Sequence, residues 1–316
     1  MENSLDILIP TYNRSALLKD CLDSIFDANQ SKTFICRVTV IDNNSSDDTR
    51  SVVENFVHRD RLRVDYLFEK QQGKSAALNA GIRNSECSLI GMIDDDEQID
   101  KKWIQVIEKW FLDLSVDFIG GPYFGLWRTK KPNWFPPEYR GVLSVDDAEE
   151  LPREPVRFGE TKEMLRGGNA VIRRSIFDLV GLYDVGLGRS GNGLGSCEDH
   201  DMFNKLINAK CNGVYVPNLI INHLVPSDRV TRAYFRRWAF GNGISLGRMD
   251  RQAPQKLVYV GRIPRYKIGS AAKGLFSIVW GSPSERFTAE LRWWSLVGFV
   301  CGAYGQAGPG NASSTD

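Results

Sequence analysis

The sequence predicts an α/β fold: a mostly parallel central sheet flanked by helices, followed by a C-terminal helical extension. Three observations predict this class. Short apolar runs alternate with segments of helical periodicity through the first hundred residues, polar side chains follow three of these runs directly, and the alternation ends near residue 115. Strands that alternate with helices are joined by right-handed crossovers, which make the strands parallel and cover both faces of the sheet. We therefore expect ligands at the carboxyl ends of the strands.

The first part of the chain supplies the alternating elements. Apolar runs predict strands at 5–10, 36–42, 62–69 and 88–94. Apolar residues at helical spacing predict helices at 14–26, 46–58, 74–85 and 101–111.

The rest of the chain is less regular. Residues 120–141 are rich in Gly, Pro and aromatic residues, which predicts a long irregular loop that serves as a binding loop or lid. Further strands and helices are expected at 164–181, 197–217 and 219–226, with helices to the end and a mobile glycine-rich stretch at 186–196. This pattern divides the chain into three parts: 1–115, 116–226 and 227–316.

The composition is that of a soluble globular protein, with 42% hydrophobic and 25% charged residues. The net charge of +1 gives no reason to expect a nucleic-acid partner. The six cysteines show no CxxC spacing, which indicates reduced thiols rather than disulfides or a zinc site. The N-terminus has neither the basic nor the apolar region of a signal peptide. We therefore expect a cytoplasmic protein.

The C-terminal segments raise the question of a membrane. Residues 262–281 are basic and aromatic, and the apolar segment 291–305 is shorter than the ~18–20 residues that span a bilayer. Two interpretations stay open: the helices lie on the inner face of a membrane as a peripheral attachment, or they pack on the core of the protein.

Three consecutive aspartates, Asp94, Asp95 and Asp96, follow an apolar strand, and their like charges require a neighbouring cation. In an extended strand end, Asp94 and Asp96 point to one side and Asp95 to the other. One carboxylate is then placed for a ribose hydroxyl and another for a divalent cation, which also takes oxygen ligands from water and substrate phosphates. The alternative is a solvated acidic turn that caps the next helix. Because Asp42 ends a neighbouring strand, we favour the metal site.

Lys74 begins a predicted helix within a Gly-Lys-Ser triplet, which suggests a phosphate-binding loop. The GxxxxGK[ST] pattern fails, because it requires glycine where the sequence has Phe68 and because it should follow the first strand. A lysine at a helix N-terminus remains a candidate contact for phosphate or nucleotide. A solvated lysine is the alternative.

Glu198, Asp199 and Asp201 open another predicted helix. Carboxylates there stabilise the helix dipole, so capping alone is one interpretation. The other is that one carboxylate acts as a general base toward an acceptor hydroxyl. His223 closes a strand, where it is either structural or a metal ligand.

Seven segments, taken in order, resemble the family 2 glycosyltransferases, which are inverting enzymes of the GT-A fold. The resemblance extends over roughly residues 4 to 245 and rests on these segments: ILIPTYNR (7–14), VTVIDNNSSDDT (38–49), QQGKSAALNAGI (71–82), IGMIDDDEQID (90–100), RGGNAVIRRSIFDLVGLYD (166–184), CEDHD (197–201) and FRRWAFGNG (235–243). The resemblance implies a Rossmann-like central sheet, a nucleotide-sugar donor (most commonly UDP-linked) bound by residues 1–115, and an acceptor bound with the catalytic groups in 116–226. The acceptor is expected to be a glycan or a lipid-linked sugar in cell-surface polysaccharide or glycoconjugate synthesis.

The resemblance also implies roles for individual residues. Asp199 matches the catalytic base, with Glu198 as its supporting neighbour. Asp94 and Asp96 match the DxD pair, in which Asp96 is the expected ligand of Mg²⁺ or Mn²⁺. His223 matches a position that contacts the metal or the diphosphate in some GT-A enzymes. The expected donor contacts are Thr11, Arg14, Asp42, Lys74, Asp94 and Asp95, and the acceptor contacts are Gly168 and Asn169. Trp134 lies in the aromatic loop and is expected to stack on an acceptor sugar.

The sequence departs from the family in one motif, and two other functions are alternatives. The QxxRW motif of processive synthases is incomplete, since Tyr234 stands where glutamine precedes Arg237 and Trp238. This favours addition of a single sugar. The rivals are a nucleotidyltransferase acting on sugar phosphates and a non-catalytic nucleotide-sugar-binding module. A dinucleotide-dependent oxidoreductase is disfavoured, because no GxGxxG follows the first strand.

Overall fold

The computed structural model describes residues 4–28, 34–59, 62–188, 197–252, 254 and 256–305. The chain divides into two compact units. The N-terminal unit comprises Met1–Lys130, Arg140–Asn192 and Cys197–Ser227, and the C-terminal unit comprises Lys131–Tyr139, Gly193–Ser196 and Asp228–Asp316. Part of the predicted mobile stretch, residues 189–196, lies outside the described residues.

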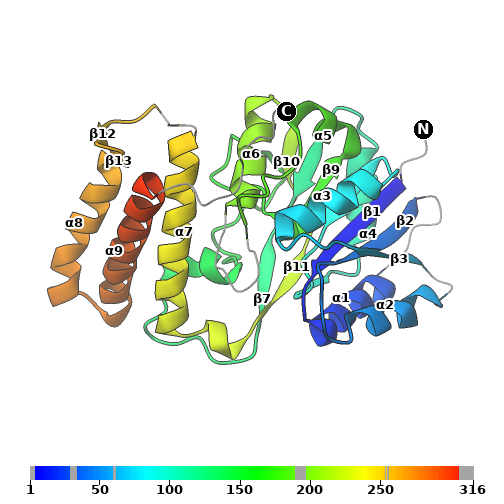
Figure 1. Cartoon of the computed structure of the whole chain (residues 1–316), viewed down its shortest axis with the longest axis horizontal. Helices are drawn as coiled ribbons and strands as arrows, with labels where there is room; N and C mark the ends of the chain where they lie inside the picture. The colour runs from blue at the N-terminus through cyan, green and yellow to red at the C-terminus, as the bar shows by residue number, and fades with distance from the viewer. Residues whose placement is uncertain are drawn as a thin grey trace, which may run out of the picture. The chain divides into compact units, whose positions relative to one another are not determined.

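An eight-stranded sheet forms the centre of the N-terminal unit in the described part of the chain (Figure 1). Its order is β3 (Arg63–Phe68), β2 (Ile35–Asp42), β1 (Ser4–Thr11), β4 (Leu89–Met92), β9 (Ala170–Arg173), β6 (Phe118–Gly120), β10 (Gly213–Tyr215) and β8 (Val156–Arg157). The first four strands are parallel, as predicted. Strand β9 runs antiparallel to both β4 and β6, and β8 runs antiparallel to β10.

Helices cover both faces of this sheet because its central strands are apolar on both sides. In β1, Leu5, Ile7 and Ile9 face one hydrophobic core and Leu8 faces another. The first core includes residues of α1 (Ser15–Asp27), α2 (Thr49–Val57) and α4 (Trp103–Phe111). The second includes residues of α3 (Lys74–Asn84), α5 (Arg174–Val180) and α6 (Glu198–Asn208). Because helices cover both faces, fully buried parallel strands appear in the sequence as continuous apolar runs.

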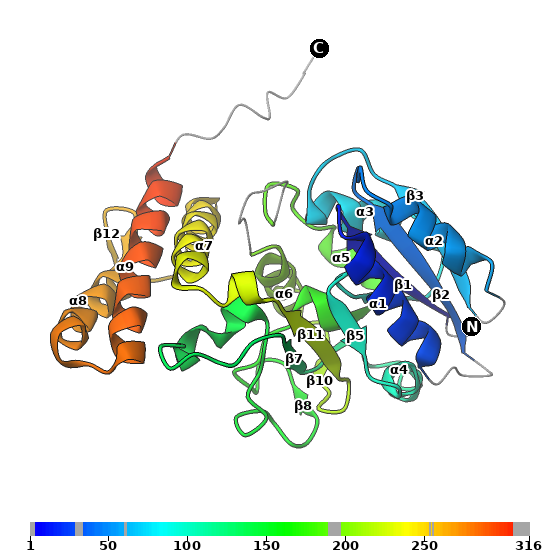
Figure 2. The ribbon, with the colours of Figure 1, turned by 90° about the horizontal axis from the view of Figure 1, so that it is seen from below.

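A second, three-stranded sheet has the order β5 (Glu97–Ile99), β11 (Ile221–Val225) and β7 (Tyr123–Trp127), and Figure 2 shows these strands beside one another. Strand β11 is antiparallel to β5 and parallel to β7. The prediction that 120–141 is an irregular loop is therefore wrong in part, since this segment contains β7 and the start of the 3₁₀ helix η1 (Pro137–Leu143). The partner of β7 lies about a hundred residues further along, and local patterns do not report such a pairing.

The C-terminal unit is mainly helical, as predicted: α7 (Arg232–Gln252), α8 (Arg265–Trp280) and α9 (Pro283–Tyr304). A short hairpin, β12 (Tyr259–Val260) and β13 (Ile263–Pro264), precedes α8, and the 3₁₀ turns η2 (Gly167–Asn169) and η3 (Ser227–Arg229) complete the elements described. Among the described residues, none of the helices has both the length and the apolar content that crossing a bilayer requires.

Helices α7 and α9 meet through glycines. The Cα atoms of Gly298 and Gly302 lie against the carbonyl oxygens of Phe240 and Ile244, and Gly243 lies against the carbonyl oxygen of Ser295. A Cβ at any of these glycines would overlap the opposing backbone. Small residues four apart allow two helix backbones to approach this closely.

Candidate active site

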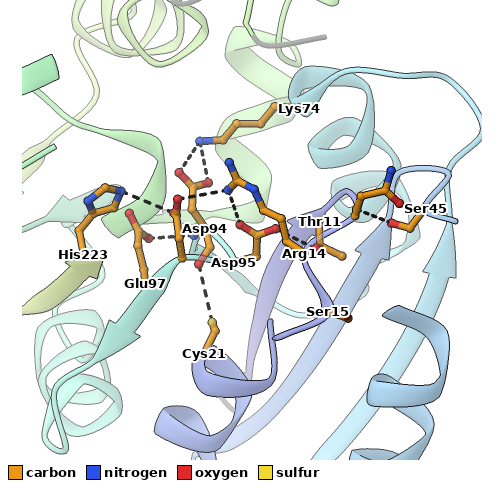
Figure 3. A network of polar contacts seen from close by, with 12 residues as sticks. Thr11, Arg14, Ser15, Cys21, Ser45, Lys74, Asp94, Asp95, Glu97 and His223 are labelled. Atoms are coloured by element: carbon orange, nitrogen blue, oxygen red, sulfur yellow. Dashed lines mark hydrogen bonds and ion pairs between the residues drawn. The ribbon is translucent and has the colours of Figure 1, made fainter. Parts of the chain in front are cut away.

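The aspartate triplet lies in a turn after β4 rather than in an extended strand end. Strand β4 ends at Met92, and Asp95 and Asp96 form the turn that leads into β5. The predicted alternation of the three side chains is therefore wrong: Asp95 and Asp96 face the same cation, and Asp94 faces a different one. Figure 3 shows Arg14 at Asp95 and Lys74 at Asp94. Asp95 is buried and does more than cap the turn, because it accepts a hydrogen bond of 2.8 Å from Thr11 Oγ1.

Arg14 neutralises the second and third aspartates. Its Nη1 lies 2.8 Å from Asp95 Oδ1 and 3.1 Å from Asp96 Oδ2. Burial raises the pKa of Asp95 to about 6, and Asp96 adds to this rise while Arg14 opposes it. Burial lowers the pKa of Arg14, but the aspartates raise it above its ordinary value, so Arg14 stays cationic.

Lys74, the first residue of α3, neutralises the first aspartate and connects the two acidic motifs. Its Nζ lies 2.7 Å from Asp94 Oδ1 and 4.0 Å from Glu198 Oε1. Burial lowers the pKa of Lys74, but Asp94, Asp199 and Glu198 raise it well above its ordinary value. The alternative of a solvated lysine does not hold, because this ammonium group is enclosed by carboxylates.

Asp42 and Asn43 end β2 and shape the neighbouring loops. Asp42 accepts hydrogen bonds of 2.8 Å from the backbone N–H of Ser45 and 2.7 Å from the hydroxyl of Tyr66. Asn43 accepts a 2.7 Å hydrogen bond from the backbone N–H of Gly73 and donates to the carbonyl oxygen of Gln71 at 2.6 Å. Asn43 therefore fixes the loop that positions Lys74, a role that the sequence motif did not indicate.

Glu97 is a buried member of the site that the sequence analysis did not select. Its Oε2 accepts a 2.8 Å hydrogen bond from the backbone N–H of Asp94, and its carboxyl group lies against the Cα of Gly168. Burial, followed by Asp94 and Asp96, raises the pKa of Glu97 well above its ordinary value. Its alternation with the buried Ile99 along β5 was the signal that it points inward.

Glu198 and Asp199 open α6, as predicted, and differ in their surroundings. Burial, followed by the charge of Asp199, raises the pKa of Glu198 to about 7, while Lys74 opposes this rise. Within the part of the chain that the structure describes, Asp199 Oδ1 is buried without a hydrogen-bond partner. The same oxygen lies against the Cα of Gly167, where a Cβ would overlap it. The two glycines of the GGN turn thus make room for two carboxylates.

The three residues predicted to contact the acceptor, Gly168, Asn169 and Trp134, have different surroundings. The side chain of Asn169 is buried and fully engaged: it accepts from Trp103 Nε1 at 2.9 Å and donates to the carbonyl oxygens of Pro122 and Leu219. Gly168 contacts Glu97 instead. Trp134 belongs to the C-terminal unit, where it packs edge-on against Phe235 and Phe287 and beneath the guanidinium of Arg232.

His223, which belongs to β11, lies beside Asp96. Its Nε2 is 3.5 Å from Asp96 Oδ1, and the backbone N–H of Leu224 donates to the carbonyl oxygen of Asp96 at 2.9 Å. Within the described residues, His223 Nδ1 is buried without a partner, and no group of three or more His, Cys, Asp or Glu side chains is arranged to hold a metal ion. A carboxylate and an imidazole fit a divalent cation that takes its other ligands from water and phosphates.

A pocket of about 390 Å³ opens beside Asp96. Its walls include Leu17 and Cys21 of α1, Gln98 of β5 and Trp127 of β7. This volume falls within the roughly 300–1,000 Å³ of small-molecule sites, and an aromatic ring beside polar groups is a typical lining.

The chain is similar in sequence to known glycosyltransferases. The family model described as "Glycosyl transferase family 2" matches residues 6–180. The chain is 25% identical over 249 residues to the succinoglycan biosynthesis protein ExoM of Rhizobium meliloti (strain 1021), an alignment that covers 78% of this chain and 74% of ExoM. It is 24% identical over 124 residues to glycosyltransferase GlyA of Streptococcus pneumoniae serotype 4; the match covers 39% of this chain and spans only 17% of the length of GlyA.

Among solved structures, the mannosyltransferase PcManGT from Pyrobaculum calidifontis, in complex with GDP-Man and Mn²⁺, superimposes with a TM-score of 0.64 at 17% identity. The match covers 96% of this chain and 88% of that one. The predicted GT-A fold, with C-terminal helices, is confirmed.

Proposed function

Because the chain belongs to glycosyl transferase family 2, we propose that it transfers one sugar from a nucleotide-sugar donor to a hydroxyl group of an acceptor, with inversion at the anomeric carbon. A UDP-linked donor is the first candidate. The acceptor is a glycan or a lipid-linked sugar in polysaccharide or glycoconjugate synthesis at the cytoplasmic face of a membrane.

One observation supports this proposal most strongly: Lys74 lies between Asp94 and Glu198, and thereby joins the donor-side triplet to the acidic pair of α6. Such a site needs positive charge for a diphosphate and a basic carboxylate for an acceptor hydroxyl. Arg14 and Lys74 supply the first, and Asp199 supplies the second.

Asp199 takes the proton in the proposed reaction. Its Oδ1 is buried without a hydrogen-bond partner among the described residues, so an acceptor hydroxyl would be its first partner. The hydroxyl oxygen forms a bond to the anomeric carbon as its proton moves to Asp199, and the bond to the diphosphate breaks on the opposite face. Glu198, whose pKa of about 7 lets it hold a proton at neutral pH, limits the negative charge beside Asp199.

Asp96 and His223 would hold the divalent cation, Mg²⁺ or Mn²⁺. When bound, this cation supplies Lewis-acid stabilisation of the charge that develops on the diphosphate. The chain's own contribution is to fix Asp96 through the backbone of β11, and to hold Arg14 beside Asp96 on the donor side. Thr11 and Asp95 complete the donor side together with Asp42.

The experiment is a panel of nucleotide sugars read by release of nucleoside diphosphate, with and without Mn²⁺. We expect one donor to release nucleoside diphosphate in a metal-dependent way. In Asp199→Asn, transfer should be lost while donor affinity survives; a fully active variant would remove Asp199 from the base role. In Asp96→Ala, the metal-dependent part of donor affinity should be lost, and equal affinity with and without EDTA in the wild type would contradict the metal site. Release of pyrophosphate would identify a nucleotidyltransferase instead, and no turnover with any donor would favour a binding module.

A further inference from the structure

The C-terminal part of the chain has a net positive charge, although the chain as a whole is almost neutral. Residues 228–305 contain 13 arginines and lysines against four aspartates and glutamates, whereas the whole chain has 40 against 39. The remainder of the chain is correspondingly acidic. A charge asymmetry of this size between parts of one chain indicates a polyanionic partner for the basic part.

The hairpin before α8 exposes aliphatic side chains on one side. The hydroxyl of Tyr259 donates a 2.7 Å hydrogen bond to Asp250 of α7, so Tyr259 faces the unit. Neighbouring side chains in a strand point the opposite way. Val258 and Val260 are accordingly 68% and 55% exposed.

The outer face of α8 continues this pattern. Tyr266, Lys273 and Trp280 are seven residues apart, which places them on one side of the helix, and Trp280 is 74% exposed. Ala271 and Gly274 are buried, and Gly274 contacts Ala289 of α9. Both Figure 1 and Figure 2 show α9 beside α8.

Basic side chains accompany these apolar ones. Arg265 and Lys273 are exposed on the outer face of α8, and among the described residues neither forms an ion pair with a carboxylate. We define the basic–aromatic face as Val258, Val260, Arg265, Tyr266, Lys273 and Trp280. Solvated loops and helices do not need large apolar groups at such exposure, so this face is suited to a partner that is both apolar and anionic.

We propose that the basic–aromatic face binds the surface of a bilayer that contains anionic lipids. Lysine and arginine lie at the level of the headgroups, while tryptophan, tyrosine and valine enter the boundary between headgroups and acyl chains. The protein then lies on the membrane without crossing it. These six residues belong to the C-terminal unit, whereas the carboxylates of the candidate active site belong to the N-terminal unit, so the inference stands apart from the identity of the transferred sugar.

The test is sedimentation of the full chain with vesicles, without donor or acceptor. Vesicles of phosphatidylcholine alone are compared with vesicles that also contain phosphatidylglycerol. We expect binding to the anionic vesicles only, weaker as added salt shortens the screening length. Replacing two cations, Arg265→Gln with Lys273→Gln, should lower the partition coefficient by about 30-fold.

Two further variants separate the contributions. Val258→Ser with Trp280→Ser should also weaken vesicle binding, but without changing its dependence on salt. Lys101→Gln with Lys102→Gln removes two exposed cations of the N-terminal unit, and Leu114→Ser removes an exposed leucine there. These matched controls should bind as the wild type does. All substituted side chains are exposed, so the melting temperature should not change.

Three outcomes would overturn the proposal. The first is no binding to anionic vesicles, and the second is equal binding of the Arg265/Lys273 double variant and the wild type. The third is that the protein binds a DNA duplex through the same two residues but does not bind vesicles. Release of nucleoside diphosphate in solution is measured on the same variants. Unchanged release with lost vesicle binding supports the membrane surface, and vesicle binding without any release would leave this inference standing while the proposed transfer fails.

Discussion

The Cα of Gly167 lies directly against the carboxylate of Asp199, so that residue 167 has no room for a side chain. The oxygen in this contact, Oδ1 of Asp199, is the one that has no hydrogen-bond partner among the described residues. Backbone geometry at one residue therefore sets the position of the proposed base.

Substitution of Gly167 by alanine should move this carboxylate. We expect the turnover number to fall by about 100-fold, because displacement of a catalytic group by about 1 Å has effects of this size. Affinity for the nucleotide, measured by calorimetry, should stay unchanged. Gly141→Ala is the matched control, since a Cβ there meets nothing within 4 Å. Equal loss of activity in both variants would show that Gly167 has no special relation to Asp199.

Glu97 should be replaceable by glutamine but not by alanine. Glutamine keeps the length of the side chain and an oxygen that accepts from the backbone N–H of Asp94. Alanine leaves that buried N–H without a partner, which costs about 1–3 kcal/mol of unfolding free energy. Denaturant unfolding and nucleotide release should both distinguish the two variants. If glutamine is as damaging as alanine, the charge of Glu97 matters rather than its hydrogen bond.

Glu198 should make the protein less stable as the pH rises. Its pKa is about 7 in the folded protein and near 4.5 when unfolded, so the folded state holds the proton more tightly. This contribution to stability is fully present below pH 4.5 and is lost as the pH rises through 7. Glu198→Gln should therefore unfold like the wild type at pH 4 but gain at most about 3 kcal/mol above pH 7. Thermal unfolding across this range tests it, with the exposed Glu149→Gln as control. A constant difference at all pH values would contradict the assigned cause.

Substitution of glycine by alanine should have opposite effects at Gly298, which lies against α7, and at Gly269, which lies in α8. Gly298→Ala would push a methyl group into the carbonyl oxygen of Phe240, and we expect a loss of about 1–3 kcal/mol from overpacking. Gly269→Ala lies in α8, where a Cβ meets nothing within 4 Å, and should gain about 0.5–1 kcal/mol from helix propensity. Denaturant titrations followed by circular dichroism measure both. Similar effects of the two substitutions would exclude a backbone contact at Gly298.

The elements that depend on local sequence were predictable, whereas those that depend on distant pairing were not. The parallel strands β1 to β4 and their helices were predictable, because hydrophobic periodicity is a local property. Strand β7 was not, since its five residues acquire their extended form by pairing with β11 about a hundred residues away. The site shows the same division. Asp94, Lys74 and Glu198 could each be selected as candidates from a sequence motif. That Asp94 and Glu198 both lie beside the ammonium group of Lys74 depends on the fold.

The aspartate triplet illustrates why side-chain directions were harder to predict than positions. The alternation rule applies only while the backbone remains extended, and β4 ends at Met92, before the first aspartate. In the turn that follows, Arg14 brings Asp95 and Asp96 together. The alternation of Glu97 with Ile99 gave a local sign that Glu97 points inward, but the pairing of β5 with β11 is not visible in the local sequence.

The glycine contacts of α7 and α9 also have a consequence for synthesis of the chain. Gly243 and Gly247 leave the ribosome about fifty residues before Gly298 and Gly302. At roughly 5–20 residues per second, α7 waits about 3–10 s for the helix that covers its glycine face. During that time the glycines of α7 lack the backbone of α9 against which they pack. Completion of the C-terminal unit is therefore a late event, which begins only when α9 has been translated.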